Sequence, residues 1–377
     1  MDKGFDVRFY QQGDDEDVVH LLDLVFDGWP KLDLIGSPLE HWRWKYIDNP
    51  QKSKSVRVAL SNNRIIGCAG NIILKIKIGD RALNCAQGVD FAVHPDFRGR
   101  GAITKMGELF EELITRHNVA VNYGIKSNPI LIARDLRRGH PHFPHTIVNL
   151  VRIKDIETHL KAIPIQKAWL IKLGYRITKY INKIMNAFSR PLSKGEGLPV
   201  HEITHFDNEV ETFWKKVSSN YRFIVERNLE YLNWRYCDPR AGGFVVRQVR
   251  ENGEILGYGV LKINRYLASY LVGYIVDLLA IPDRLDVADT LVEDAIKYFD
   301  DSDVNIVNYL VVKNHPYESV LRARGFLDSR VKFHLFYVPT TSEANNEMRN
   351  LEKLPASKVF YSWRDHDSLP VSMPSYR

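Results

Sequence analysis

The sequence predicts an α/β (α+β) chain of two tandem domains with one fold, each a mixed, mostly antiparallel sheet flanked by helices. Strand-like runs alternate with helical patterns through most of the 377 residues, a length that favours two or three domains. Several segments of the first half also recur in the second half in the same order, which is the pattern that a duplication leaves.

The composition is that of a globular protein suited to an anionic partner. Hydrophobic residues make up 45% of the chain and aromatic residues 11%, which is enough for sizeable cores. The 52 basic and 46 acidic residues give a net charge of +6. This mild excess suits an anionic cofactor without requiring nucleic acid, so we expect no nucleic-acid partner.

The cysteines and the N-terminus favour a cytoplasmic protein. Cys68, Cys85 and Cys237 are too scattered for a disulfide framework or a Cys-x-x-Cys zinc site. Residues 1–18 are too charged for a signal peptide, and no apolar run approaches the ~20 residues of a membrane span.

The first half begins with two expected helices. The amphipathic pattern at 15–29 carries acidic residues in its first turn. A second helix is expected within 37–50, because Ser37 is a plausible N-cap, Pro38 suits the first helical position and Pro50 is a stop signal.

Strand-like runs then follow at 56–60, 64–78 and 82–93, separated by turn signals, and predict an antiparallel meander. The next segment, HPDFRGRGAITKM at 94–106, combines a Pro-marked turn, a Gly/Arg loop and a helical pattern. Such an arrangement turns backbone N–H groups toward a phosphate, so we interpret it as a diphosphate cradle. A helix at about 100–117, a strand at 119–125, a short helix closed by Gly139 and a strand at 146–153 are expected after it.

The second half repeats this order. In the alignment of the two halves, Asp90 corresponds to Asp277, and the pairs of matching segments are LEHWRWKYIDNP with LEYLNWRYCDP, QGVDFAVHPD with YIVDLLAIPD, and VNYGIKSN with VNYLVVKN. We therefore expect a first domain at 1–160, a basic amphipathic linker helix at 161–198, a second domain at 199–339 and a C-terminal tail at 340–377.

The two copies differ at the diphosphate loop. Where the first has FRGRGAI, the second has RLDVADT, which lacks glycine and places Asp286 and Asp289 at the start of a helix. Carboxylates there stabilise the helix by themselves and repel a diphosphate, so the second copy is not expected to bind the cofactor in this way.

The chain resembles the GNAT superfamily of N-acyltransferases, specifically tandem members with an intact first domain and a degenerate second. Arg98 and Gly101 match the family's Arg/Gln-x-x-Gly-x-Gly/Ala motif, whereas Ile103 replaces its last small residue. Asn128 and Gly139 match the Asn after the fifth strand and the Gly that closes the next helix. The resemblance covers residues 1–155 well and 200–338 more loosely.

The resemblance implies an acyl-CoA site in the first domain, with acetyl-CoA as the expected cofactor. The strand at 89–93 would splay from its neighbour, freeing backbone groups for the pantetheine arm and turning the Val93 N–H toward the thioester carbonyl as an oxyanion donor. Arg98, Arg100 and Lys105 would add positive charge at the margins of the diphosphate. The implied cofactor-binding residues are Phe91, Ala92, Val93, Arg98, Gly99, Arg100, Gly101, Ala102, Ile103 and Asn128.

The catalytic residues are less clearly indicated. Asp90 is the candidate general base, although Asp277 at the matching position of the second copy also suggests a structural role for this aspartate. Many family members place a Tyr four residues before the closing Gly to protonate the departing thiolate, whereas this chain has Asp135. Water, a residue of the second domain, or no acid at all could then do this.

Two further segments were considered as sites. The loop histidines His140, His142 and His145 have no acidic or Cys partner nearby, so no metal is predicted. Residues 165–188 combine an apolar helical face with basic residues and no acid. Peripheral contact with an anionic membrane is one interpretation, and packing between the domains is the favoured one.

The sequence therefore predicts a CoA-dependent N-acyltransferase that uses acetyl-CoA and acetylates a primary amine of a small molecule. The WRWKY segment at 42–46 resembles GNAT-like proteins linked to surface polysaccharide modification, which suggests an amino sugar as the acceptor. The alternatives are a non-catalytic CoA-binding or scaffold protein and a tandem acyltransferase dependent on aminoacyl-tRNA.

Overall fold

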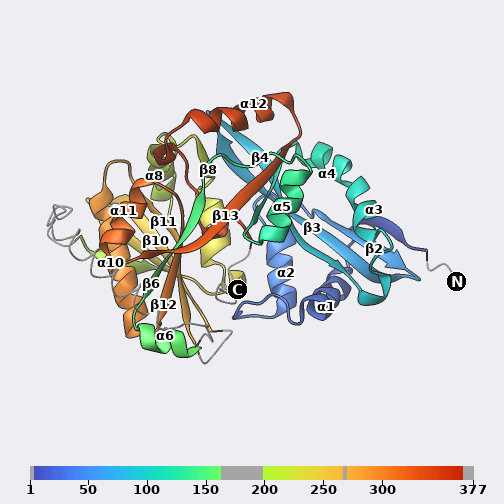
Figure 1. Ribbon diagram of the computed structural model, residues 1–377, viewed down its shortest axis with the longest axis horizontal. Helices are drawn as coiled ribbons and strands as arrows, with labels where there is room; N and C mark the ends of the chain where they lie inside the picture. Colours follow the sequence, from blue (N-terminus) through green and yellow to red (C-terminus); the bar gives the residue numbers. More distant parts are fainter. Residues whose placement is uncertain (1–3, 163–197, 266–269, 368–377) are drawn as a thin grey trace. The chain divides into compact units, whose positions relative to one another are not determined.

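The computed structural model describes residues 4–162, 198–265 and 270–367 (Figure 1). The amphipathic segment at 165–188 lies outside the described residues. The chain divides into two units. The first unit comprises residues 1–143, 238–243 and 335–352, and the second comprises 144–237, 244–334 and 353–377. None of the helices within the described ranges is long and apolar enough to cross a membrane.

The first unit is built on a mixed sheet with strand order β1-β2-β3-β4-β5, and the end of β13 lies next to β5 (Figure 1). Neighbouring strands from β1 to β4 pair antiparallel, whereas β4 and β5 are parallel. The expected meander is thus confirmed. The strands are β1 (Asp6–Phe9), β2 (Val56–Ser61), β3 (Arg64–Ile78), β4 (Arg81–Val93), β5 (Val119–Lys126) and β13 (Leu327–Pro339).

Helices cover both faces of this sheet. One hydrophobic core joins α1 and α2 to the sheet through side chains such as Leu22 and Trp42. Two smaller cores join other side chains of the sheet to Met106 of α3 and to Leu113 of α4. The helices are α1 (Asp15–Phe26), α2 (Pro38–Tyr46), α3 (Ala102–Glu108), α4 (Phe110–His117), α5 (Pro129–Arg137) and α12 (Ser342–Asn350).

The start of α2 follows from its sequence. The Ser37 hydroxyl accepts from the Glu40 amide at 3.2 Å, while the Glu40 carboxylate accepts from the Ser37 amide at 2.8 Å. This capping box satisfies two of the amides that a helix start leaves without partners. The predicted N-cap at Ser37 and the Pro38 start are confirmed.

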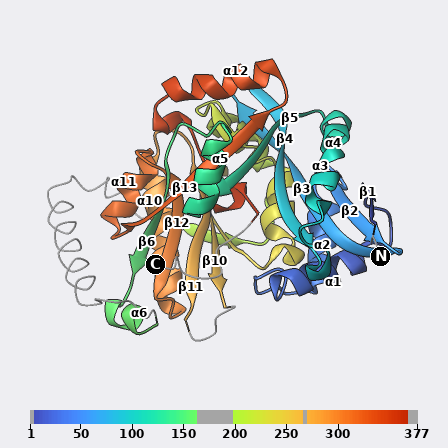
Figure 2. The same cartoon turned by 45° about the vertical axis from the view of Figure 1, so that its right-hand side comes forward.

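The second unit has the sheet order β13-β6-β12-β11-β10-β9-β7, in which β6 lies between the first part of β13 and β12 (Figure 2). The strand expected to close the first domain, β6, therefore belongs to the second unit. Its strands are β6 (Ile147–Ile153), β7 (Val200–Ile203), β8 (Phe223–Val225), β9 (Val245–Glu251), β10 (Glu254–Asn264), β11 (Val272–Ala280) and β12 (Ile306–Val312). Its helices are α6 (Ile156–Ala162), α8 (Glu209–Ser218), α9 (Leu229–Leu232), α10 (Leu285–Asp301) and α11 (Pro316–Ala323).

Gly70 on β3 makes room for the Tyr46 hydroxyl. A Cβ at this position would collide with the Tyr46 ring and hydroxyl. We predict that Gly70→Ala lowers the free energy of unfolding by about 2 kcal/mol, because the core must shift to admit the methyl group. Denaturant-induced unfolding of the variant measures this loss.

Gly124 on β5 is the matched control, since a Cβ there meets nothing within 4 Å. Gly124→Ala should leave stability nearly unchanged. Equal losses in the two variants would show that the close approach of Tyr46 to Gly70 has no special cost.

Candidate functional site

Strands β4 and β5 diverge within the first unit. Their parallel pairing ends at Gln87 and Tyr123, whereas β4 continues to pair with β3 as far as Val93. Residues 88–93 therefore have a hydrogen-bonding edge that β5 does not use. This divergence confirms the splay that the family resemblance implied.

The Val93 amide faces this open edge. His94 N–H donates to Ile66 O at 2.8 Å, and Gly67 and Val93 are the next opposing residues in the same antiparallel register. Hydrogen-bonded and non-hydrogen-bonded pairs alternate in such a ladder, so the N–H and C=O of Val93 point away from β3. The Val93 carbonyl accepts from Arg98 Nε at 3.3 Å on that outer edge. The Val93 amide therefore points toward the open edge of β4.

The glycine loop follows directly. Gly99 and Gly101 have φ values of +75° and +81°, a region that residues with a Cβ rarely adopt, and Gly101 is the N-cap of α3. No backbone acceptor takes up the amides of residues 99–103, all of which lie in the described part of the chain. These amides are available to an anionic group, as expected for a diphosphate cradle.

The side chains around the glycine loop differ in their contacts and exposure. Arg100 lies over the Phe97 ring at 5.2 Å, while Lys105 donates to Phe5 O at 2.9 Å and is therefore engaged at β1. Ile103 replaces the family's small residue, yet its side chain is 40% exposed, so it does not crowd the core. Phe91 is 46% exposed and packs over Gly88, where a Cβ would collide with its ring.

Asn128 serves as a helix cap. Its side-chain oxygen accepts from the Ile130 amide at 2.9 Å at the start of α5, and the residue is exposed. The Asn after the fifth strand thus has a local structural function. Its predicted contact with the cofactor stays a prediction.

Asp90 accepts hydrogen bonds from three side chains. Its Oδ2 receives Lys45 Nζ and Tyr46 Oη, each at 2.6 Å, and its Oδ1 receives Trp29 Nε1 at 2.9 Å. The Lys45 side chain is 1% exposed. Asp90 also has φ +52° within the irregularity where β4 shifts register against β3. These contacts favour a role in holding the bulged strand, and the proposed general-base role remains untested.

The corresponding aspartate of the second unit has a similar environment. Asp277 is fully buried and accepts from Tyr236 Oη at 2.9 Å and from Arg227 Nε at 3.1 Å. Tyr236 and Tyr46 are aligned residues of the two halves. Each unit thus links its WRWKY-like segment to the strand that carries the aspartate through a Tyr–Asp hydrogen bond, and the aspartate also pairs with Lys45 in the first unit and with Arg227 in the second.

The second unit also has a splay, but its outward-facing amide is occupied. Pairing of β11 with β12 ends at Ile275 and Tyr309, well before β11 ends at Ala280. Ala280, the residue aligned with Val93, donates its N–H to Tyr317 Oη at 2.9 Å. The hydroxyl of α11 therefore takes the position that a thioester carbonyl would need.

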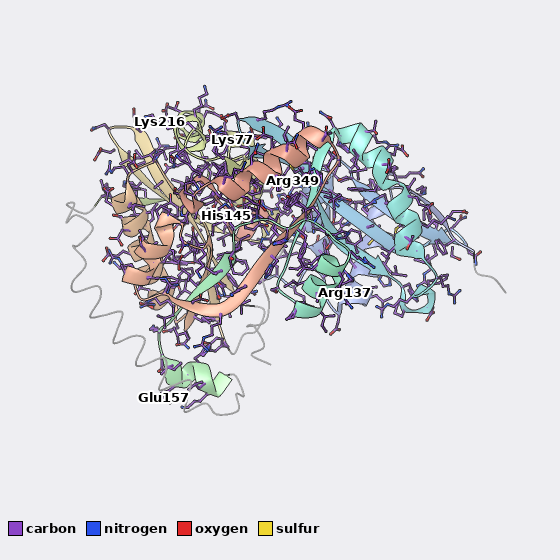
Figure 3. All side chains as sticks on the ribbon, turned by 45° about the horizontal axis from the view of Figure 1, so that its top comes forward. Lys77, Arg137, His145, Glu157, Lys216 and Arg349 are labelled. Carbon is purple, nitrogen blue, oxygen red and sulfur yellow. The ribbon has the colours of Figure 1, made fainter. Side chains whose placement is uncertain are left out.

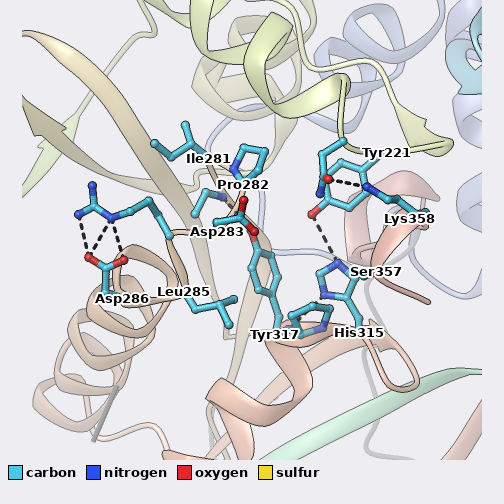
Figure 4. A pocket seen from close by; sticks show the side chains of 14 residues that line it. Tyr221, Ile281, Pro282, Asp283, Leu285, Asp286, His315, Tyr317, Ser357 and Lys358 are labelled. Atoms are coloured by element: carbon cyan, nitrogen blue, oxygen red, sulfur yellow. Dashed lines mark hydrogen bonds and ion pairs between the residues drawn. The ribbon is translucent and has the colours of Figure 1, made fainter. Parts of the chain in front are cut away.

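A pocket of about 560 Å³ surrounds this point (Figure 4). Tyr221 Oη lies 3.4 Å from His315 Nε2, and burial lowers the pKa of His315 to about 3, so this imidazole is neutral near pH 7. Asp286 pairs with Arg284 at the start of α10, at 2.7 Å. The structure places Asp286 in the first turn of α10, as the sequence predicted, and a carboxylate there disfavours a bound diphosphate.

Asp135, in the position of the family's Tyr, is 1% exposed and forms ion pairs with Lys126 and with Arg134, the latter at 3.2 Å. An ion-paired carboxylate holds no proton to donate.

No cluster of three or more potential metal ligands occurs among the described side chains, His140, His142 and His145 included.

Sequence reasoning missed Trp29, Lys45 and Tyr46 as partners of Asp90. The signal available was a lysine, Lys45, within the aromatic segment WRWKY, since a cation among large apolar residues usually has a buried counter-charge. Its partner lies 45 residues further along the chain, and no local pattern connects the two.

A sequence model of the acetyltransferase (GNAT) domain family matches residues 6–129. A search of curated proteins found no significant match. Among solved structures, an Enterococcus faecalis V583 protein described as a probable N-acyltransferase has a TM-score of 0.59 at 11% identity, covering 90% of this chain and 74% of that one.

Two further structures are similar. Saccharomyces cerevisiae N-myristoyltransferase with bound myristoyl-CoA and inhibitors has a TM-score of 0.56 at 12% identity, covering 90% of this chain and 80% of that one. A GCN5-related N-acetyltransferase from Anabaena variabilis ATCC 29413 has a TM-score of 0.55 at 12% identity, with coverages of 88% and 72%. At these identities the structures show a shared fold. Together with the family match, the comparisons support the prediction of an acyltransferase.

Replacing Asp90 tests its role in stability. Asp90→Asn removes the counter-charge of buried Lys45, so we predict a loss of about 3 kcal/mol in the free energy of unfolding. Chemical denaturation measures it. Asp17→Asn at an exposed position of α1 is the control and should change stability by less than about 0.5 kcal/mol. A fully stable Asp90→Asn protein would remove the structural interpretation and leave Asp90 as a candidate base.

Proposed function

We propose that this protein, whose residues 6–129 match an acetyltransferase (GNAT) domain, transfers the acetyl group of acetyl-CoA to a primary amine of a small molecule. The observation that carries this proposal is the pairing, within one unit, of an outward-facing Val93 amide with the unpaired amides of residues 99–103. The first provides a donor for a carbonyl oxygen, and the second provide donors for a diphosphate.

The residues of the first unit would divide the work as follows. Acyl-CoA would supply an activated thioester. The Val93 N–H would donate to its carbonyl oxygen and stabilise the negative charge that develops there as the amine attacks. The loop amides, with Arg98 at their margin, would bind the diphosphate, and Asp90 would maintain the bulge that orients Val93.

The acceptor is the least constrained part of the proposal. An amino sugar, free or nucleotide-linked, is proposed because the segment at 42–46 resembles proteins that modify surface polysaccharides. The donor is proposed to be acetyl-CoA, and the yeast structure with bound myristoyl-CoA makes a long-chain acyl-CoA the natural competitor in the same experiment.

Calorimetric titration with acetyl-CoA tests the cofactor site. The wild-type protein should bind saturably, whereas Gly101→Asp should bind at least about 100-fold more weakly. Aspartate would be strained at a φ of +81° and would place a carboxylate beside the diphosphate.

Gly107→Asp is the matched control, because it adds the same charge to the same helix at an exposed position where a Cβ meets nothing within 4 Å. Its affinity should be near that of the wild type. If the wild type fails to bind acetyl-CoA or myristoyl-CoA, the proposed function is wrong. Binding without acyl transfer to any member of an amine panel would favour a scaffold protein.

The second unit should not bind acyl-CoA. We expect one acetyl-CoA per chain in the same titration, because Tyr317 occupies the Ala280 amide and Asp286 lies at the helix start. Tyr317→Phe should leave the stoichiometry at one. Two equivalent sites per chain would contradict this assignment.

A further inference from the structure

We propose that the Lys126 ammonium, positioned by Asp135, protonates the sulfur of the departing CoA thiolate. This inference rests on the proposed acyl transfer and assigns the acid that the sequence left open. Lys126 would be a catalytic residue, and Asp135 a positioning residue.

The location of Lys126 supports this assignment. Strand β5 ends at Lys126, three residues beyond Tyr123, the last residue of β5 that pairs with β4. Lys126 is therefore on the diverging end of β5, across the open edge from residues 88–93 of β4. The Val93 amide that faces the proposed thioester carbonyl lies on that opposite strand, so a group at the end of β5 is well placed for the bonded sulfur.

The contacts of Lys126 hold its ammonium in place. Lys126 Nζ forms an ion pair with Asp135 Oδ2 and lies 5.2 Å from the centre of the Phe336 ring. The Asp135 side chain is 2% exposed, whereas that of Lys126 is 26% exposed. The carboxylate is thus enclosed while the ammonium keeps access to its surroundings. Arg137, labelled on α5 in Figure 3, is by contrast fully at the surface.

The second unit shows that the fold does not need this ion pair. The alignment of VNYGIKSN with VNYLVVKN places Val312 at the position of Lys126, and the equal spacing to the closing glycine places Leu321 at that of Asp135. Strand β12 ends at Val312 just as β5 ends at Lys126, and both Val312 and Leu321 are buried.

A buried ion pair is usually no more stabilising than an apolar pair of similar volume. The unit with a filled amide and no glycine loop has the buried apolar residues Val312 and Leu321 at these two positions. The unit with an open amide and a glycine loop has the ion pair. The ion pair therefore accompanies the features that acyl-CoA chemistry requires, which is expected if its role is catalytic rather than structural.

The proton balance of the step is complete. The amine nitrogen forms a bond to the acyl carbon, the carbon–sulfur bond breaks, and the electron pair of that bond stays on sulfur. Lys126 donates one proton to sulfur, giving the CoA thiol and a neutral lysine. The amine nitrogen, which is positively charged after it bonds to the acyl carbon, loses one proton to solvent. Solvent returns a proton to Lys126, so the products are an amide and a thiol.

The charges facing Lys126 suit a proton donor. Burial and the guanidinium groups of Arg134 and Arg138 lower the pKa of Lys126 from its ordinary value. The Asp135 carboxylate, which forms an ion pair with Lys126, opposes this effect. A lowered pKa brings a lysine closer to that of the thiol it must protonate.

The test needs no knowledge of the acceptor. CoA is bound to the full-length protein, and the thiolate absorbance in the ultraviolet is followed as a function of pH. A neighbouring ammonium stabilises the thiolate, so the pKa of the bound thiol in the wild type should lie about one unit or more below that of free CoA. Lys126→Gln should abolish this decrease, while Lys126→Arg should retain it.

The other variants separate the possible outcomes. Lys75→Gln removes an exposed charge from β3 and should behave as the wild type. Asp135→Asn keeps the lysine but loosens it, and should reduce the decrease without abolishing binding. Calorimetry with CoA on every variant shows that the site is intact. If CoA binds the wild type and the thiol titrates identically in the wild type and Lys126→Gln, the inference is overturned while the proposed function stands. If CoA does not bind the wild type, the proposed function is wrong, and the inference that rests on it is wrong as well.

Discussion

The ion pair between Lys45 and Asp90 is the interaction on which the geometry of the candidate site depends. Asp90 lies in the left-handed region at a bulge of β4, and Lys45, Tyr46 and Trp29 all donate to its carboxylate. These contacts stabilise a backbone conformation that is otherwise unfavourable. The bulge sets which edge of β4 the Val93 amide faces, three residues later. The contacts of Asp90 can therefore decide whether the Val93 amide faces the open edge of β4.

Comparison of the two units distinguishes features that belong to the fold from features that the proposed chemistry would need. Both have the Tyr–Asp hydrogen bond and both have parallel strands that part before they end. The splay is thus a property of the fold. The two units differ in the groups near the splay. In the second unit Tyr317 accepts a hydrogen bond from the Ala280 amide, whereas in the first unit the loop amides of residues 99–103 have no backbone partner. The open amide and the glycine loop therefore occur together in the first unit, and the second unit has neither.

The sequence predicted those features that depend on neighbouring residues. The cap at Ser37 and the meander turns are set by a few adjacent positions, and the structure confirms them. Contacts between distant segments were not predictable in this way. Asp90 was recognised as important, but its donors come from segments 44 to 61 residues away. Asn128 was assigned to the cofactor, whereas its visible contact is the local cap of α5.

The strand composition of the units adds a constraint that duplication alone would not produce. The sheet of the first unit includes residues 335–339, from the end of β13, and Thr340 N–H donates to Ala120 O at 2.9 Å. The sheet of the second unit includes β6, from the first half of the chain. Each sheet is completed by a strand that the repeat would assign to the other half. Neither half can then form its full sheet alone, because each sheet takes one strand from the other half of the chain.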